Sequence, residues 1–167
     1  MSDTIHLMPK EPVQLEATPT HFRHLSRLAK DIYLFENLSI SELDHVAEQI
    51  DLWEYPKGSV ICKQDEPGDQ FFIIYQGWVE VVVGRKFLRR GTELAQLGPG
   101  DVFGEMALIL ERPRSADVFA GDRPVQLFTV GEEIFNYLLR TNEEFADSVD
   151  RLAADRHMDT ALRLGDD

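Results

Sequence analysis

The chain has 167 residues, of which 43% are hydrophobic, and carries a formal net charge of -13 at pH 7. This length supports one substantial hydrophobic core and excludes two ordinary domains joined by a linker. The acidic balance argues against nucleic-acid binding, which needs a face lined with Lys and Arg. No apolar stretch approaches the roughly 20 residues that span a bilayer. Residues 1–10 have no basic start followed by an apolar run, which argues against a secretory signal. We therefore expect a cytoplasmic protein without membrane insertion.

The N-terminal part of the chain is predicted to contain a leader and two helices. Residues 1–20 include three prolines and no sustained hydrophobic period, which indicates a flexible leader. From residue 21, apolar side chains recur at three- and four-residue spacing, as in an amphipathic helix. A second helix is predicted after Ser39, where Ser41-Glu42-Leu43-Asp44 resembles a capping arrangement. Helices are therefore expected over residues 21–50.

Residues 51–131 are predicted to form strands, because glycines separate short apolar or alternating runs there. Close spacing of short strands is typical of an antiparallel sandwich or roll. The segment 85–90 carries four basic residues and is expected to be an exposed hairpin tip that promotes solubility or docks a partner. The expected strands are 52–55, 60–62, 71–76, 79–84, 92–97, 116–120 and 125–130.

A helical period returns over residues 132–164. The fold class is therefore α+β, mainly β: an antiparallel β-roll, jelly-roll-like, with flanking N-terminal and C-terminal helices in a single domain over 21–167. The residues after Thr141 are too few for a separate helix-turn-helix domain. A chain that starts at Met1 with a leader favours a stand-alone sensor over a domain cut from a larger regulator.

The residues expected to bind a ligand lie in the segment 97–116. Gly104 followed by Glu105-Met106-Ala107-Leu108 can open a short helical turn whose free N–H groups face an anion. Arg114 adds a planar cationic fork that can hold two phosphate oxygens at once. The Glu105 carboxylate can accept a hydrogen bond from a sugar hydroxyl. This combination suits a sugar phosphate.

Phe103-Gly104-Glu105-Met106-Ala107-Leu108, followed by Pro113-Arg114-Ser115-Ala116, resembles the phosphate-binding cassette of cyclic-nucleotide-binding domains. These domains occur in the regulatory subunit of protein kinase A, catabolite activator protein and nucleotide-gated channels. Shorter matches at 55–58, 66–69 and 76–81 extend the resemblance over about 35–155.

The resemblance implies a role for each matching residue. Arg114 would bind the exocyclic phosphate oxygens and Glu105 the ribose 2'-hydroxyl, while the backbone of Gly104 and Ala107 approaches the sugar phosphate. Ser115 matches a position beside the phosphate and the base. The other expected lining residues are Val81, Phe103, Met106 and Ala116.

The resemblance favours cAMP as the ligand and leaves cGMP, a cyclic dinucleotide and a ligand-free interaction scaffold open. It also implies that the helix from 143 to about 164 moves over the ligand and signals to an unidentified protein effector. A homodimer is left open as well. Asp117 is the feature in doubt, because a carboxylate near the phosphate would weaken binding unless it points away.

No catalytic residue, metal or cofactor is expected, and the chain is not predicted to be an enzyme. It lacks a Ser/His/Asp order, a P-loop and clustered metal ligands, and residues 52–130 contain no His. This argues against a cupin metal site on the strands. Cys62 is the only cysteine, which excludes an intrachain disulfide, and it is expected to be a buried strand residue.

Overall fold

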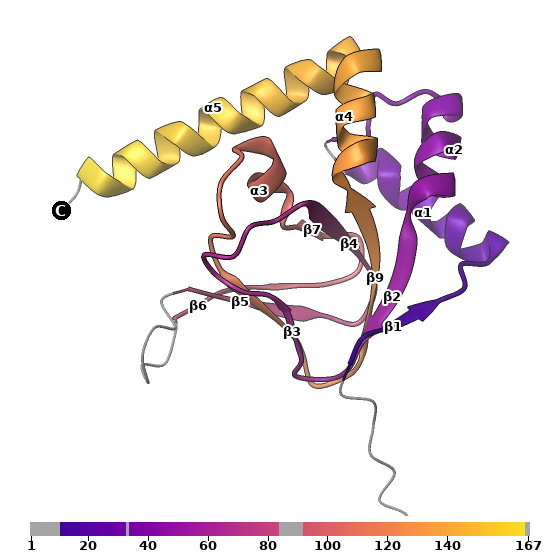
Figure 1. The fold of residues 1–167 in the computed structure, drawn as a ribbon, viewed down its shortest axis with the longest axis horizontal. Helices are drawn as coiled ribbons and strands as arrows, with labels where there is room; N and C mark the ends of the chain where they lie inside the picture. Colours follow the sequence, from indigo (N-terminus) through magenta and orange to yellow (C-terminus); the bar gives the residue numbers. More distant parts are fainter. Residues whose placement is uncertain (1–10, 33, 84–91, 166–167) are drawn as a thin grey trace, which may run out of the picture.

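The computed structural model describes residues 11–32, 34–83 and 92–165, and two antiparallel sheets dominate it. In Figure 1 the sheets form a roll, and the helices gather at one end of it. One sheet has the order β1 (Val13–Leu15), β2 (Asp51–Tyr55), β9 (Val125–Gly131), β4 (Gln70–Gln76) and β7 (Val102–Phe103). The other has the order β3 (Val60–Cys62), β8 (Asp117–Ala120), β5 (Val79–Val83) and β6 (Thr92–Leu97). The predicted antiparallel β-roll is confirmed.

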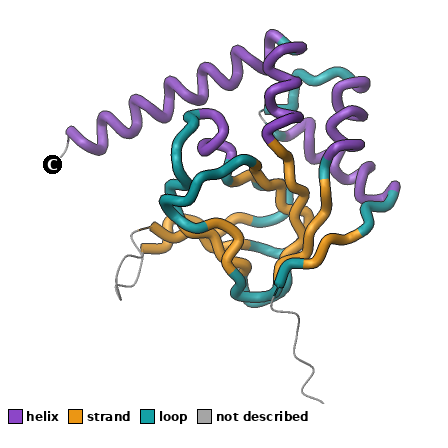
Figure 2. Tube along the Cα trace, viewed as in Figure 1, coloured by secondary structure: helices purple, strands orange, loops and turns teal. Residues whose placement is uncertain are grey.

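Five helices flank the roll in the described part of the chain. Figure 2 shows them in purple against the strands of the roll. None of the helices in the described ranges is both long enough and apolar enough to cross a bilayer. The helices are α1 (Pro19–Asp31), α2 (Ile40–Gln49), α3 (Glu105–Ile109), α4 (Glu132–Thr141) and α5 (Glu143–Gly165).

Strand β4 joins the two hydrophobic cores because both of its faces are buried. Phe71 and Ile73 pack into the core beneath the helices, which also contains Phe35, Leu138 and Phe145. The alternate residues of β4, Phe72 and Ile74, point into the interior of the roll. A strand buried on both faces is apolar at successive positions rather than alternating, which explains why residues 71–74 are four successive buried hydrophobic residues.

The N-terminal segment is more ordered than predicted. Residues 13–15, assigned to the flexible leader, form strand β1, which pairs with β2 in antiparallel register. Main-chain hydrogen bonds to β2 hold this edge strand in place. Three residues are too few for an alternation of polar and apolar side chains to be recognised in the sequence. Pro19 is the first residue of α1, where its missing N–H costs nothing. Residues 1–10 lie outside the described residues.

Helix α2 begins after Ser39, as predicted, but its capping residue differs from the prediction. The capping residue is Ser39 rather than Ser41: its hydroxyl accepts from the Glu42 N–H at 3.1 Å, and the Glu42 carboxylate accepts from the Ser39 N–H at 3.1 Å. This reciprocal pair satisfies two N–H groups at the start of the helix.

Strand β7 was not predicted, because two residues show no alternation. The predicted hairpin tip at 85–90 lies outside the described residues.

The first turn of α5 is fixed to the other helices through Asn142. The Asn142 amide nitrogen donates to both Glu42 carboxylate oxygens at 3.1 Å, and its oxygen accepts from the Phe145 N–H at 2.8 Å. Phe145 is buried and meets Phe135 of α4 edge to face, with ring centroids 5.6 Å apart. In Figure 1 the rest of α5 runs away from α4, over α3 and beyond the roll.

Candidate functional site

A cavity of about 330 Å³ opens between sheet strands β5, β6 and β8 and the segment around α3. All of the residues singled out from the sequence line it, although they come from three parts of the chain. Their individual roles toward a ligand stay predictions. The residues are Val81, Phe103, Gly104, Glu105, Met106, Ala107, Arg114, Ser115 and Ala116.

Sequence reasoning missed the apolar side chains that complete the lining. Residues two apart on a strand share one face, so Leu97 accompanies Ala95 on β6, and Val118 follows Ala116 on the other side of the cavity. This alternation was available as a signal for both strands. Cys62 and Val102 carried no such signal, because their strands are only three and two residues long.

Arg114 is the cation among the described residues that line this cavity. Its side chain is only 9% exposed, and its guanidinium lies 5.7 Å from the centroid of the Phe72 ring. Nη1 donates to the Gly104 carbonyl at 2.9 Å, and Nη2 donates to the Gln70 carbonyl at 2.8 Å. Both acceptors are neutral, so they orient the guanidinium without cancelling its charge. Because a guanidinium has five N–H groups, an anion in the cavity can bind those that these two bonds do not use.

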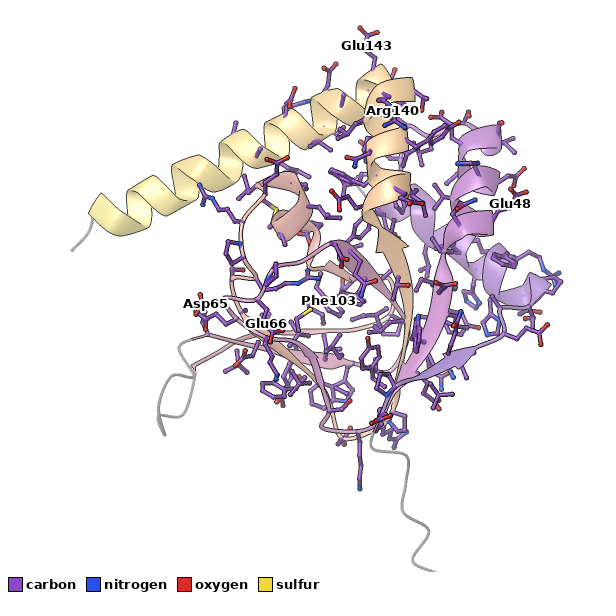
Figure 3. The ribbon with its side chains drawn as sticks, in the orientation of Figure 1. Glu48, Asp65, Glu66, Phe103, Arg140 and Glu143 are labelled. Atoms are coloured by element: carbon purple, nitrogen blue, oxygen red, sulfur yellow. The ribbon has the colours of Figure 1, made fainter. Side chains whose placement is uncertain are left out.

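The main chain of Arg114 is fixed as firmly as its side chain. Its N–H donates to the Glu66 carbonyl at 2.7 Å, and its carbonyl accepts from the Asp65 N–H at 2.8 Å. Figure 3 labels Asp65 and Glu66 on the loop beside this segment, with Phe103 inside the roll. The loop between β3 and β4 therefore holds the arginine by its backbone.

Two glycines leave room for the guanidinium. A Cβ atom on Gly68 would lie 2.5 Å from Cζ and Nε of Arg114, and one on Gly104 would lie 2.6 Å from Nη1. Gly104 also has φ +82°, a left-handed conformation that glycine adopts without a steric cost. It turns the chain from β7 into α3, so Glu105 and Ala107 come to face the same cavity as Arg114. The predicted short helical turn after Gly104 is confirmed.

Asp117 does not point into the cavity. Its neighbours Ala116 and Val118 line the cavity, whereas Asp117 is not among the described lining residues. One carboxylate oxygen of Asp117 accepts from the Gln64 N–H at 2.7 Å. The Asp117 carboxylate therefore points away from the cavity and binds the backbone of the loop before β4.

Cys62 closes part of the cavity wall. It is buried, as expected, and burial raises the pKa of its thiol to about 11, while the nearby Arg114 charge acts in the opposite direction. A thiol with this pKa is almost entirely protonated at neutral pH, so it behaves as an apolar lining group.

Among the described residues, no three His, Cys, Asp or Glu side chains are grouped as metal ligands.

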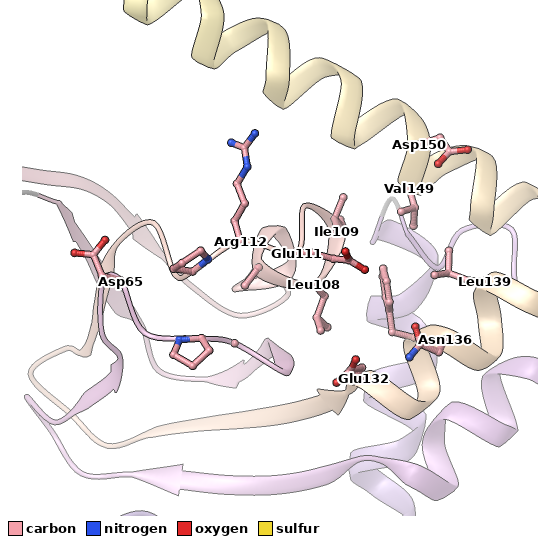
Figure 4. Close-up of a pocket in the computed structure, with 15 residues that line it drawn as sticks. Asp65, Leu108, Ile109, Glu111, Arg112, Glu132, Asn136, Leu139, Val149 and Asp150 are labelled. Atoms are coloured by element: carbon pink, nitrogen blue, oxygen red, sulfur yellow. The ribbon is translucent and has the colours of Figure 1, made fainter.

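A second, larger cavity of about 560 Å³ lies between α3 and the helices α4 and α5 (Figure 4). Its apolar lining includes Leu108 and Ile109 of α3 and Leu139 of α4. The charged residues around it are Asp65, Glu111, Arg112, Glu132 and Asp150, most of them acidic. Arg114 lines only the smaller of these two cavities. The smaller cavity is therefore the candidate anion site, although it is not the larger of the two.

Comparison with known proteins agrees with this geometry. Residues 52–142 match the family model described as cyclic nucleotide-binding domain. The chain is 34% identical over 148 residues to the cAMP-dependent protein kinase regulatory subunit of Mycosarcoma maydis, a match that covers 80% of this chain and 28% of that protein. It is 32% identical over 119 residues to a cGMP-dependent protein kinase of Toxoplasma gondii, covering 71% of this chain and 11% of that protein.

Among solved structures, the chain resembles the catabolite activator protein of Thermus thermophilus with a TM-score of 0.66 and 29% identity. The match covers 80% of this chain and 62% of that one. The chain thus spans less than a third of the length of either kinase protein and under two thirds of the activator.

The contact between Gly68 and Arg114 predicts an energetic coupling. Gly68→Ala should lower the free energy of unfolding by about 1–3 kcal/mol, because the new methyl group displaces a buried cation. In an Arg114→Ala background the cost should fall by about 1–2 kcal/mol, with a remainder from Ala107, whose Cβ would be 2.9 Å away. Denaturant unfolding of the four proteins measures this coupling. Gly98→Ala is the matched control, since nothing lies within 4 Å of its added methyl. An equal cost in both backgrounds would contradict the coupling.

The raised pKa of Cys62 predicts a pH dependence of stability. The thiol of the unfolded chain ionises first as the pH rises from about 9, whereas the buried thiol ionises near 11. Cys62 should therefore contribute full stability below pH 9 and lose about 2–3 kcal/mol of it between pH 9 and 11. Free energies of unfolding of the natural chain and Cys62→Ala, measured across this range, should converge by that amount. A constant difference between the two free energies of unfolding would show that burial does not raise the pKa of the Cys62 thiol.

Proposed function

The chain belongs to the cyclic nucleotide-binding domain family, and on this premise we propose that it senses a cyclic mononucleotide and passes the binding event to a protein partner. The observation that carries the proposal is the buried guanidinium of Arg114 in the cavity wall. Its two hydrogen-bond acceptors are neutral carbonyls, so the guanidinium keeps its full positive charge. A desolvated cation is costly unless an anion offsets it. A phosphate group meets that need.

The cavity also suits the rest of a nucleotide. Glu105 lines it from the first turn of α3, where its carboxylate can accept a bond from a ribose hydroxyl. Val81, Leu97 and Val102 supply apolar surface for the ribose and the base. Ser115 is exposed next to Arg114, where its hydroxyl can reach the phosphate or the base.

cAMP is the first candidate ligand. The match to the cAMP-dependent kinase regulatory subunit extends over 148 residues, compared with 119 for the cGMP-dependent kinase. The cavity of about 330 Å³ is near the lower end of the roughly 300–1,000 Å³ typical of ligand pockets. This size favours a mononucleotide over a cyclic dinucleotide, which is about twice as large.

Helix α3 links the smaller cavity, called the nucleotide cavity from here on, to α5. Ala107 lines both the smaller cavity and the larger one between α3, α4 and α5. Glu105 lines the nucleotide cavity and also a third cavity, to which Leu152 of α5 contributes. A ligand that moves α3 therefore changes the surface on which α5 packs, and it shifts α5 if it binds one arrangement more tightly.

We expect α5 to carry the signal to the effector. Its first turn is anchored through Asn142, and none of the described residues that line the nucleotide cavity comes from α5. Closure of α5 toward the ligand would complete the site. The role is regulatory and involves no catalytic step, and both the protein effector and a homodimer stay predictions.

Nucleotide binding is tested by thermal unfolding of the nucleotide-free protein. cAMP at 100 times its dissociation constant stabilises a protein by about 2.7 kcal/mol and should raise Tm by roughly 5–10 °C. Arg114→Ala should abolish this shift, because the phosphate loses its buried partner. Arg123→Ala, which removes an exposed arginine, should keep it.

Parallel melts with cGMP and cyclic di-GMP identify the ligand. A response to cyclic di-GMP alone would overturn the mononucleotide assignment. No response to any of the three would favour a ligand-free interaction scaffold.

Movement of α5 is tested by the distance between two spin labels. One label replaces exposed Ala154 of α5 and the other replaces exposed Lys57 of the roll. Cys62 can stay in place, because burial and its raised pKa keep it unreactive at pH 7. Saturating cAMP should change this distance by several ångströms and leave a Lys57–Gln96 pair within the roll unchanged. An unchanged α5 distance would show that the helix does not transmit binding.

A further inference from the structure

Residues 64–70 are the loop before β4 together with the first residue of that strand, and they are called the 64–70 loop below. They contact Arg114 on several sides. Asp65 and Glu66 bind its main chain, and the Gln70 carbonyl accepts from its guanidinium. Between these contacts, Gly68 packs against the guanidinium so closely that a Cβ atom would overlap it. The position of the arginine therefore depends on the conformation of this loop.

The loop holds a conformation that needs support. Asp65 has φ +69°, in the left-handed region that is unfavourable for a residue with a Cβ atom. Its N–H is nevertheless aimed at the Arg114 carbonyl, at 2.8 Å. Contacts that hold the neighbouring residues in place stabilise this turn and, with it, the arginine.

Asp117 supplies such a contact from outside the loop. Its backbone is fixed in sheet register opposite Val82 on β5. From this fixed position its carboxylate accepts from the Gln64 N–H at 2.7 Å, one residue before Asp65. A hydrogen bond to an ionised acceptor is stronger than one between neutral groups. Its side chain is directed away from the nucleotide cavity, which Ala116 and Val118 line.

We propose that Asp117 is a positioning residue for the ligand: it fixes the 64–70 loop, and the loop holds Arg114 in the geometry that binds phosphate. This inference rests on the proposed nucleotide binding. It reverses the expectation from charge alone, under which a carboxylate near an anion site weakens binding. The two effects have opposite signs, so removing the carboxylate distinguishes them.

The test measures the dissociation constant of cAMP by calorimetry for the full chain and its variants. Asp117→Ala should weaken binding about tenfold or more, equivalent to about 1.4 kcal/mol. Asp117→Asn removes the charge and keeps an acceptor oxygen, so it should bind within about threefold of the natural chain. Asp122→Ala is the matched control, because it removes a carboxylate that accepts from Trp78 Nε1 at 2.9 Å instead of from the loop.

Equal or tighter binding by Asp117→Ala would overturn the proposal. So would a loss in Asp117→Asn as large as in Asp117→Ala, because the acceptor would then not be what matters.

A second readout without nucleotide separates this proposal from the proposed function. Hydrogen exchange of the Gln64 and Asp65 amides and of the Arg114 Nε–H, followed by NMR, should quicken in Asp117→Ala and not in Asp122→Ala. If the natural chain binds no nucleotide but these rates rise, nucleotide sensing fails while the positioning of Arg114 stands. Unchanged rates at Arg114 would overturn the positioning role whatever the ligand.

Discussion

The site depends on one constraint, the burial of a permanently charged guanidinium whose two hydrogen-bonded carbonyl partners are neutral. Arg114 lies in the wall of the roll with Gly104 and Gln70 as acceptors. The two carbonyls fix the direction of the guanidinium and leave its positive charge in place, so an anion bound there would stabilise the folded domain. Under the proposed function, ligand binding and folding energetics would be linked at this residue.

Much of the surrounding architecture serves this constraint. Gly68 and Gly104 make room for the guanidinium, and the loop before β4 binds its backbone. On the far side, Phe72 of β4 lies beneath the guanidinium, while Phe71 of the same strand packs against the helices. One strand therefore connects the anion site with the helical core.

Most of the fold followed from local patterns. Alternating or apolar runs between glycines located seven of the nine described strands to within a residue or two, and hydrophobic periodicity located α1, α2, α4 and α5. The missed elements, β1 and β7, have three and two residues. They form because a neighbouring strand offers main-chain partners, and no side-chain pattern reports this.

By itself the sequence predicted that Gly104, Glu105 and Arg114 belong to one candidate site, because their spacing and chemistry suit a sugar phosphate, and all three line the same cavity. It also determined the antiparallel roll, since strand periodicity is local. Only the tertiary structure decided what the Asp117 carboxylate binds and which loop holds Arg114. Gln64 and Asp117 are 53 residues apart, and their contact depends on the pairing of β3 with β8. Alternation along a strand sets which residues share a face, but only the pairing of strands distant in the sequence decides which residues that face meets.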